Sequence, residues 1–457
     1  MAIMMRVVPR RATTWWTETY SRRQRRYLIV IVLIALAVRL AWVIVAARPP
    51  LVGDPVAYMF HGETIARGQG YRSIVGTFHL VPVRRLPPTA FYPIGYPGTL
   101  AVLFWIVLHT PIPDNLPKAV GIFQALLGVG TVILTSELAR RVFGNRVAIL
   151  TAAIMAVWPN LVSYTALAHY ETVFIFLSVA ALAVIMQPWP RGIVSWRRLT
   201  AFGAVLGVAA LVRPTILMLL PILVVCWIVA GATWRRALAQ AALAAIVVSV
   251  VVAPSLVRNS LVMHSAVFST GIGDALCDSR HPGASGRFEI AAKYCLDPHA
   301  GVPPAKYEVV KNRENTKTAI RFVLDHPLDE ARLWFWRGYY SFRDDHETFE
   351  AFAQDRGNPL HGSRLVGVIE SVSDAYYYFV LGLALLALPV FLSRRMPDRA
   401  PRLLLLLAGV QAALVPFLLF GDPRYKIPVV PFFAIGAAVS LSRLCAGSIP
   451  RRRDAQD

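Results

Sequence analysis

The sequence carries little charge for its length, and it is especially poor in acidic residues. Only 16% of its 457 residues are charged, and 26 aspartates and glutamates face 47 lysines and arginines, for a formal net charge of +21. The hydrophobic content of 56% and the mean hydropathy of +0.53 are typical of a chain that crosses a bilayer several times. The surplus arginines fall mostly in short runs between apolar segments, as in cytoplasmic loops of membrane proteins. The charge is therefore explained by membrane topology, and no nucleic-acid partner is expected.

Several motifs of soluble enzymes are missing as well. The sequence has no GxxxxGK[ST] or GxGxxG fingerprint for nucleotides, and no HExxH, CxxC or GxSxG pattern. Nucleotide-driven, metalloprotease, zinc-ribbon and serine-hydrolase functions therefore have no support. No internal repeat is found, which weakens transporter architectures built from inverted repeats.

Cysteine is scarce, with four in the whole chain. Cys226 and Cys445 lie in apolar segments, where a buried free thiol is the simplest expectation. Cys277 and Cys295 lie in one polar loop and would form a disulfide only if that loop faces an oxidising compartment. The sequence leaves that bridge open.

Long apolar runs are what the sequence has in abundance. We predict an all-α polytopic membrane protein with about ten transmembrane helices. The expected spans are residues 27–46, 119–139, 147–163, 170–187, 200–212, 215–231, 237–254, 375–392, 403–420 and 427–444. An eleventh apolar run, "YPIGYPGTLAVLFWIVLHTP" at residues 92–111, is too short for a crossing of about 20 residues and is bracketed by prolines.

The positions of the basic runs fix the expected sidedness. With the basic leader inside, "ARRVFGNR" also lies inside only if residues 92–111 do not cross, so we expect a re-entrant or juxtamembrane helix there. The large loops then lie outside, and the second one is expected to be helical, with amphipathic helices over residues 318–342. The expected divisions are a cytoplasmic leader (1–26, before a retained signal anchor), a core (27–257) that includes the first outer loop (47–118), a second outer loop (258–373), C-terminal transmembrane helices (374–444) and a cytoplasmic tail (445–457).

Two acidic residues stand at predicted outer ends of helices. Asp54 follows the first span in "GDPVAYMFHGETIARGQGYR", and the helical spacing of Tyr58, Glu63 and Arg67 predicts an amphipathic helix there. Glu171 lies at the outer mouth of a later span, either as a helix-start residue favoured by the dipole or facing Asp54 across a cavity. Two such carboxylates would suit a general base, with a metal or an acceptor positioned between them.

Basic residues at the same outer ends oppose the sidedness rule and need another reason. A shared anionic ligand is one, since arginine matches phosphate geometry, and contact with lipid headgroups is the other. The candidate substrate-binding residues are Tyr58, Arg84, Arg85, Tyr92, Arg213, Arg258, Arg424, Tyr425 and Lys426.

Three further features are given simpler explanations. Arg39, in mid-span, is expected to be structural or to face water. The acidic stretch "RDDHETFE", residues 343–350, is expected to be an exposed turn rather than a metal site. His169 and His264 are expected to be polar anchors rather than acid or base groups.

The order of several short motifs resembles that of the bacterial GT-C glycosyltransferases, in the branch of the protein O-mannosyltransferases and the aminoarabinose transferases. The motifs are "GDPVAY", "ARGQGY", "PTAFYPIGYPGTLAVLF", "ELARRVFGNR", "WPNLVSYTALAHYETVF", "LVRPTILMLLP", "APSLVRNSL" and "DPRYKIPVVPFFAIGAA". The resemblance extends from the first span to the last.

The resemblance implies a GT-C-like bundle and transfer of a monosaccharide from a polyprenyl phosphate to a cell-envelope acceptor, outside the cell membrane. It implies that Asp54 is the base or holds the acceptor, that Glu171 is the second acid, and that Arg258 and Arg424 contact the phosphate. Members of the family often carry a second acid directly after the first, whereas this chain has Pro55, so a divalent metal is left undecided. A flippase of lipid-linked sugars and a polysaccharide polymerase or ligase are the alternatives.

Overall fold

The protein is helical throughout the part that the computed structural model describes, which is residues 20–50, 53–74, 83–111, 115–295, 304–394 and 399–447. These residues contain no strand, only two isolated bridges, Arg72 with Pro88 and Arg287 with Gly421. The α-helices are α2 (Arg22–Ala46), α3 (Asp54–Ala66), α4 (Gly95–Leu108), α5 (Leu116–Phe143), α6 (Asn145–Ala156), α7 (Pro159–Ser163), α8 (Glu171–Ile185), α9 (Trp196–Val212), α10 (Leu219–Val229), α11 (Trp234–Met263), α12 (Ile272–Cys277), α13 (Pro304–Asp325), α14 (Pro327–Phe342), α15 (Glu347–Gln354), α16 (Arg364–Leu386), α17 (Leu388–Leu392), α18 (Arg399–Leu418) and α19 (Val430–Gly447). Short 3₁₀ helices are η1 (Val83–Arg85), η2 (Tyr164–Ala166), η3 (Pro190–Gly192), η4 (Pro214–Met218) and η5 (Pro423–Val429).

Helices occupy all ten of the predicted spans. Among the described residues, six helical segments are long and apolar enough to cross a membrane, and a seventh is formed if the pair α6–α7, bent by 59°, counts as one span. Shorter apolar helices cover Glu171–Ile185 and Pro214–Val229. The predicted polytopic all-α architecture is confirmed, with a helix count close to that expected.

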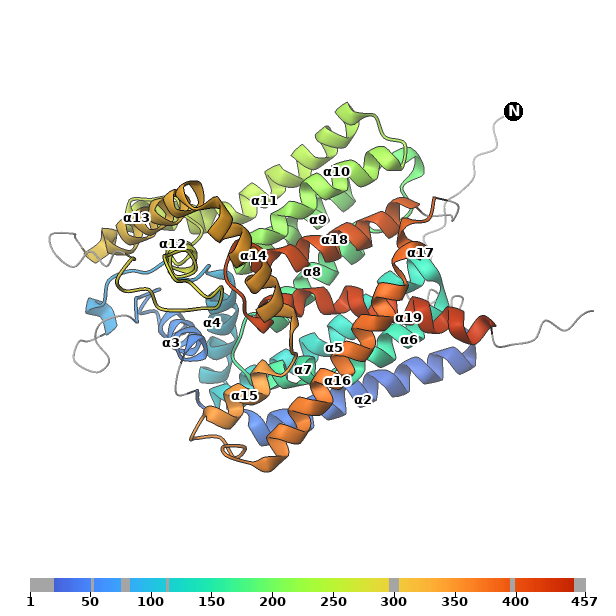
Figure 1. Cartoon of the computed structure of the whole chain (residues 1–457), viewed down its shortest axis with the longest axis horizontal. Helices are drawn as coiled ribbons and strands as arrows, with labels where there is room; N and C mark the ends of the chain where they lie inside the picture. Colours follow the sequence, from blue (N-terminus) through green and yellow to red (C-terminus); the bar gives the residue numbers. More distant parts are fainter. Residues whose placement is uncertain are drawn as a thin grey trace, which may run out of the picture.

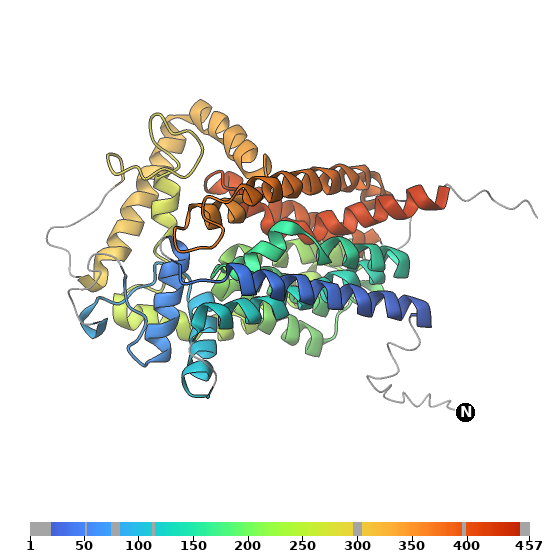
Figure 2. The ribbon, with the colours of Figure 1, turned by 90° about the horizontal axis from the view of Figure 1, so that it is seen from below.

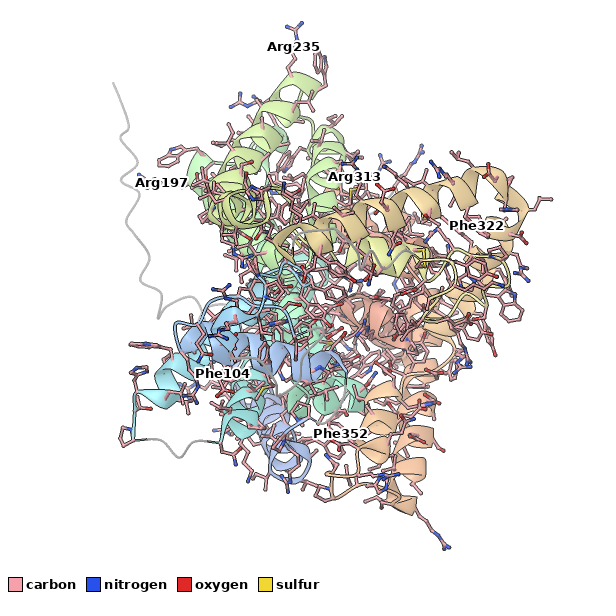
Figure 3. The ribbon with its side chains drawn as sticks, turned by 90° about the vertical axis from the view of Figure 1, so that its left-hand side faces the viewer. Phe104, Arg197, Arg235, Arg313, Phe322 and Phe352 are labelled. Atoms are coloured by element: carbon pink, nitrogen blue, oxygen red, sulfur yellow. A yellow bond between two sulfur atoms is a disulfide. The ribbon has the colours of Figure 1, made fainter. Side chains whose placement is uncertain are left out.

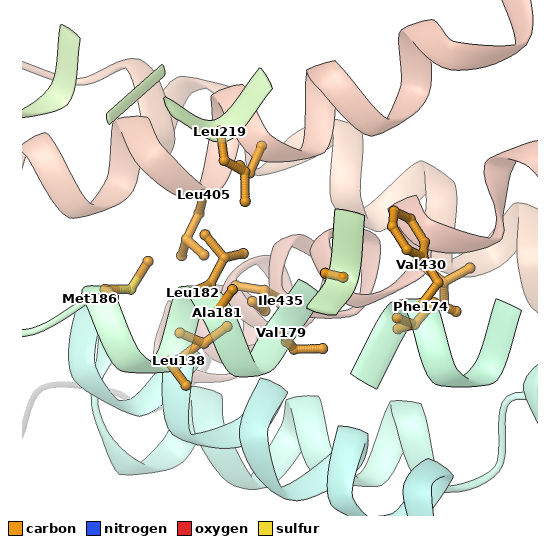
Figure 4. Packing of buried hydrophobic residues seen from close by; sticks show 14 of the residues in the cluster. Leu138, Phe174, Val179, Ala181, Leu182, Met186, Leu219, Leu405, Val430 and Ile435 are labelled. Carbon is orange, nitrogen blue, oxygen red and sulfur yellow. The ribbon is translucent and has the colours of Figure 1, made fainter. Parts of the chain in front are cut away.

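The bundle helices run along the long axis of the molecule, and Figure 4 shows how they pack. Side chains from α5, α8, α18 and α19, including Leu138, Leu182, Leu405 and Ile435, meet in the middle of the bundle. Packing of this kind holds helices together in a bilayer, where burial from water contributes little.

The Arg-rich connections gather at one end of the bundle. Asn145, the first residue of α6, donates to Gln24 near the start of α2, and Arg141 donates to the carbonyl of Met186 at the end of α8. The start of α2 and the end of α19 lie at this end, whereas α3, α12 and α13 lie at the other (Figure 2). The long connections are thus separated from the basic ones, as the sidedness rule predicts.

Arg39 is buried where the helix pair α6–α7 breaks. Its guanidinium donates to the carbonyls of Ala156 (2.8 Å), Met155 (3.1 Å) and Ala35 (3.0 Å). The last carbonyls of a helix have no partner within it, and leaving them bare inside a membrane is costly. Arg39 therefore has a structural role.

Helix α4 is the short apolar helix at residues 92–111. It has 14 residues and runs across the bundle axis rather than along it (Figures 1 and 2). Gly95, at its start, packs against the end of α9, where an added Cβ would lie 2.4 Å from the carbonyl carbon of Leu211. This close approach brings the start of α4 next to Arg213.

The second long connection forms a helical cover over this end of the bundle. Figure 3 shows α13, which carries Arg313 and Phe322, lying across it. A disulfide joins Cys277 to Cys295, the pairing that the sequence left open. Glu308 of α13 accepts hydrogen bonds from Thr89 (2.7 Å) and Thr270 (2.9 Å), so the cover is tied to the first outer loop.

Candidate functional site

A cavity of about 1190 Å³ opens at the covered end of the bundle. Its walls come from the start of α3, the start of α4, the turn before α8, the end of α9, η5 and the cover. The polar and charged side chains that line it include Arg48, Asp54, Tyr58, Tyr92, Tyr96, His169, Tyr170, Arg213, Ser269, Asp274, Asp278, Lys311, Asp422, Arg424 and Tyr425. Phe268, Phe288, Phe420 and Ile272 add apolar surface. A volume of this size accommodates a ligand larger than one sugar.

Asp54 and Arg424 form the centre of charge in this cavity. Asp54 Oδ2 lies 2.7 Å from Arg424 Nη1, and Asp54 Oδ1 accepts a hydrogen bond of 2.7 Å from the hydroxyl of Tyr92. Asp54 is the first residue of α3, after Gly53 with φ of 76° and before Pro55, so the turn directs its carboxylate at the cavity. Burial alone would raise the pKa of Asp54, but the charges of Arg424 and His169 and the hydrogen bond from Tyr92 lower it to about 2. The carboxylate is therefore ionised at any physiological pH.

Arg424 is held from both sides. It lies in η5, and its Nε is 3.6 Å from Oδ2 of Asp422, whose Oδ1 also accepts from the backbone N–H of Arg424. Only 21% of the Arg424 side chain and 27% of the Asp54 side chain are exposed. Two carboxylates thus fix one guanidinium on the cavity wall.

Arg213 is a second cation on the cavity wall, and it differs from Arg424 in lacking an acidic partner. It is 7% exposed, its guanidinium carbon lies 4.8 Å from the ring centre of Tyr425 and 5.8 Å from that of Tyr170, and its Nη2 has no hydrogen-bond partner. Within the described residues no carboxylate lies at ion-pair distance from it. A buried guanidinium held only by aromatic faces is suited to an anionic ligand.

An aromatic wall separates the cavity from the bundle. The ring of Tyr58 packs on those of Tyr92 (4.6 Å) and Tyr96 (5.0 Å), and the hydroxyl of Tyr96 donates to Gln124. Gln124 in turn donates to the carbonyl of Leu167. This wall fixes the turn that leads into His169 and α8.

Glu171 is fully buried at the first position of α8, behind the cavity surface rather than on it. Its Oε2 lies 3.4 Å from Nδ1 of His169, and neither carboxylate oxygen has a hydrogen-bond partner in the part of the chain that the structure describes. His169 lines the cavity. The sequence therefore located the acid correctly along the chain, but a histidine stands between it and the cavity.

Six of the residues singled out from the sequence line this one cavity. They are Asp54, Tyr58, Tyr92, Arg213, Arg424 and Tyr425.

Arg258 and Arg85, two other predicted positions, do not line it. Arg258 donates to the carbonyls of Thr89 (2.6 Å) and Tyr71 (2.9 Å), so it fastens the first outer loop to α11 instead of facing a ligand. Arg85 is exposed outside the cavity, and the side chain of Arg84 lies outside the described part of the chain. The expected phosphate contact by Arg258 has no support in this geometry.

Lys426 also lies away from the cavity, in a buried polar cluster. Its ammonium is 3.0 Å from Oδ1 of Asp345, which also accepts from Asn160, while Oδ2 of Asp345 accepts from Trp158. Lys426 and Asp345 are both completely buried. The expectation of an exposed acidic turn at residues 343–350 is therefore wrong, because this turn inserts its aspartate between α7 and η5.

Glu347 belongs to the same buried cluster. It accepts hydrogen bonds from Tyr164 (2.7 Å) and Asn160 (3.0 Å). Burial, together with the charge of Asp345, outweighs the attraction of Lys426 and raises the pKa of Glu347 to about 7. The cluster joins η5, which carries Arg424, to the turn before α8.

No group of three or more histidine, cysteine, aspartate or glutamate side chains in the described ranges is placed to hold a metal ion. Asp54 already forms an ion pair with Arg424, and the ionisable side chain beside Glu171 is that of His169. A metal site is thus not preformed by these side chains.

Sequence reasoning missed three residues of the site. His169 was interpreted as a polar anchor, and Tyr170 and Asp422 were not singled out. The signals were present, since "AHYE" places a histidine two residues before a helix-start acid and "GDPRYK" places an acid two residues before Arg424. What could not be read from the sequence is that these two turns meet.

Comparison with known proteins agrees with this architecture. Residues 98–257, about a third of the chain, match the family of dolichyl-phosphate-mannose-protein mannosyltransferases. Among curated proteins, none matches this chain.

Solved structures share the fold at low identity. An oligosaccharyltransferase of Archaeoglobus fulgidus, in the apo form, has a TM-score of 0.53 and 15% identity, over 95% of this chain and 51% of the other. The oligosaccharyltransferase AglB of Archaeoglobus fulgidus, in complex with an inhibitory peptide and a dolichol-phosphate, has a TM-score of 0.51 and 13% identity, over 95% of this chain and 51% of the other. ArnT from Cupriavidus metallidurans, bound to undecaprenyl phosphate, has a TM-score of 0.51 and 17% identity, over 91% and 60%.

This chain therefore spans about half the length of the oligosaccharyltransferase and 60% of that of ArnT. The resemblance to GT-C glycosyltransferases is confirmed at the level of fold and of this family match. The chain is thus a multi-pass membrane protein with a GT-C-like helical fold, and its residues 98–257 match the dolichyl-phosphate-mannose-protein mannosyltransferases.

Proposed function

We propose that this protein is a glycosyltransferase of the cell membrane. It transfers a monosaccharide from a polyprenyl-phosphate donor to a hydroxyl or amine of a cell-envelope acceptor. The observation that carries the proposal is the convergence of Asp54, Arg424 and Arg213 on one cavity at the covered end of the bundle.

The donor side of the proposal rests on the two arginines. A polyprenyl-phosphate sugar carries a negative phosphodiester and a long apolar chain. Arg213, without a carboxylate partner, supplies the charge for the phosphate, and the apolar surface of Phe268 and Phe420 suits the first prenyl units. The similar structures bound to undecaprenyl phosphate and to a dolichol-phosphate favour the same class of lipid.

The chemistry follows from the same charges. The acceptor oxygen or nitrogen attacks the anomeric carbon, and the bond from that carbon to the phosphate oxygen breaks with its electron pair on the phosphate. Arg213 and Arg424 stabilise the charge that builds on the leaving phosphate, an effect worth several kcal/mol in a site that excludes water. Asp54, held ionised, accepts a hydrogen bond from the acceptor and orients it.

The proposal places the cavity on the extracytoplasmic face. The Arg-rich connections and the start of α2 lie at the opposite end, which the sidedness rule assigns to the cytoplasm. A donor that arrives already activated on a lipid phosphate needs no nucleotide at this face, which fits the absence of nucleotide motifs from the sequence.

Transfer of radiolabelled sugar from undecaprenyl phosphate in membranes tests the proposal. Wild type should label endogenous acceptors, Asp54→Ala should not, and Glu63→Gln, which alters an exposed acid on the same helix, should behave as wild type. Arg213→Gln should weaken binding of undecaprenyl phosphate, whereas Arg67→Gln should not. Movement of lipid-linked sugar across vesicles without any transfer would instead indicate a flippase.

A further inference from the structure

His169 and Glu171 form a pair with an unusual set of contacts. Glu171 is completely buried, and among the described residues its two oxygens have no hydrogen-bond partner; Nδ1 of His169 lies 3.4 Å away. This separation is longer than a normal hydrogen bond, as is common before a substrate is bound. A buried carboxylate without partners is costly, so it needs a reason to be there.

The orientation of the imidazole gives that reason. Nδ1 of His169 is buried and faces Glu171, while the side chain as a whole is 11% exposed and lines the cavity. A carboxylate beside Nδ1 keeps the proton of the neutral ring on that nitrogen. The lone pair of Nε2 is then available on the cavity side. The same carboxylate stabilises the imidazolium that forms when Nε2 takes a proton.

Asp54, in contrast, is poorly suited to accept a proton. Both its oxygens are already engaged, one by Arg424 and one by Tyr92, at 2.7 Å each. These contacts lower the pKa of its carboxyl to about 2, far from the value at which a base is most effective near neutral pH. The two acids of the site therefore have different tasks.

We infer that His169 is the catalytic base of the transfer and that Glu171 is its positioning residue. This inference rests on the proposed function and assigns the proton of that reaction. Nε2 of His169 removes the proton from the acceptor hydroxyl as its oxygen bonds to the anomeric carbon. The bond from that carbon to the phosphate oxygen breaks, the electron pair leaves with the polyprenyl phosphate, and the imidazolium later releases its proton to water.

The imidazole is faced by carboxylates and by aromatic rings. Its Nδ1 lies 3.4 Å from Glu171, Asp54 lies near enough to interact with it electrostatically, and the rings of Tyr58 and Tyr164 lie 6.1 and 6.4 Å from it. A general base acts only in its unprotonated form, so a transfer that depends on an imidazole base should slow in acid.

The test compares kcat, donor KM and pH profile in membranes that contain the full chain, with undecaprenyl-phosphate-linked tritiated mannose or aminoarabinose as probe. His169→Gln should lower kcat by about 10²- to 10⁴-fold with the donor KM within about twofold of wild type, and its profile should lose the acid limb. Glu171→Gln should lower kcat less and shift the same limb.

Added imidazole should restore part of the rate to His169→Gly but none to Asp54→Asn. Binding of undecaprenyl phosphate in detergent reports whether each variant is folded.

Two results would overturn the assignment of the base while leaving the proposed function intact. One is a His169→Gln enzyme with the kcat and pH profile of wild type. The other is a His169→Gly enzyme that binds undecaprenyl phosphate normally, transfers poorly and gains nothing from imidazole. Absence of transfer by wild type with these donors would refute the proposed function, and the base with it.

Discussion

Asp54 and Arg424 are 370 residues apart in the chain, yet their side chains meet at 2.7 Å in the cavity. One lies at the first turn of α3 and the other in η5, just before the last helix of the bundle. The contact therefore joins an N-terminal and a C-terminal part of the chain within one site. Its geometry depends on the packing of the whole bundle.

Removal of either partner should cost about the same activity. Asp54→Asn and Arg424→Gln should each lower the rate of transfer about 100-fold or more, because each leaves the other charge without its partner. The double variant should be hardly slower than the worse single one, since residues in direct contact do not act additively. Initial rates of wild type, the two single variants and the double variant form a double-mutant cycle. If the double variant loses activity by the product of the two single losses, the two side chains act separately.

The contribution of Asp54 to stability should depend on pH in a specific direction. Its pKa is lowered from 3.8 to about 2 in the folded protein, so its ion pair stabilises the fold fully above about pH 5. That stabilisation is lost as the pH falls through 4 towards 2. The difference in unfolding temperature between wild type and Asp54→Asn, measured from pH 8 to 3, should stay constant at first and shrink only below about pH 4. A difference that disappears near pH 6 would contradict the lowered pKa.

The buried pair Lys426–Asp345 should matter far more to stability than an exposed pair. Lys426→Met leaves the Asp345 carboxylate buried without its cation and should destabilise the fold by about 3–5 kcal/mol. Lys317→Met, which removes an exposed partner of Glu314, should leave the stability almost unchanged, because solvent screens such a pair. Thermal unfolding in detergent measures both.

The double variant Lys426→Met with Asp345→Asn provides the check on that explanation. It should recover part of the loss, since the Asp345 charge that Lys426 had neutralised is then removed as well. A double variant less stable than Lys426→Met would mean that Asp345 contributes mainly through Trp158 and Asn160.

The cysteines offer a test of sidedness. The disulfide Cys277–Cys295 lies in the cover, Cys445 is exposed near the end of α19, and Cys226 is buried. In intact cells, a membrane-impermeant maleimide should label the chain only after treatment with an impermeant reductant. Cys445 should react only when the membrane is opened. Labelling of Cys445 in intact cells would invert the proposed topology.

The disulfide should also stabilise the cover. It closes a short loop of 18 residues, for which restriction of the unfolded chain is worth about 3 kcal/mol. Replacement of both cysteines by serine should therefore lower the unfolding temperature, and cleavage of the cover by added protease should become faster.

The helices and their ends were largely predictable, because local patterns decide them. Long apolar runs predicted the ten spans, and the basic connections predicted which ends lie together. Asp54 was predictable because an acid directly after a span, in a Gly-Asp-Pro turn, has few other reasons to be there. The contacts of Arg258 with the carbonyls of Thr89 and Tyr71 were not predictable, because an arginine at a helix end gives no sign of whether it meets a ligand or a carbonyl. The prediction of an exposed turn at residues 343–350 was wrong for a related reason. Burial of Asp345 depends on Lys426, which lies 81 residues further along the chain.

Hydrophobicity and charge along the chain were enough to predict a membrane-embedded helical bundle, to group its basic loops at one end, and to locate the turns that carry acid and arginine. Hydrophobicity and charge are local properties, so they can be read along the chain. The folded structure was needed to show that Arg424 pairs with Asp54, that Arg213 has no acidic partner within the described ranges, and that His169 stands between Glu171 and the cavity. These relations join side chains far apart in sequence or depend on side-chain directions, and both are fixed by the packing of the helices.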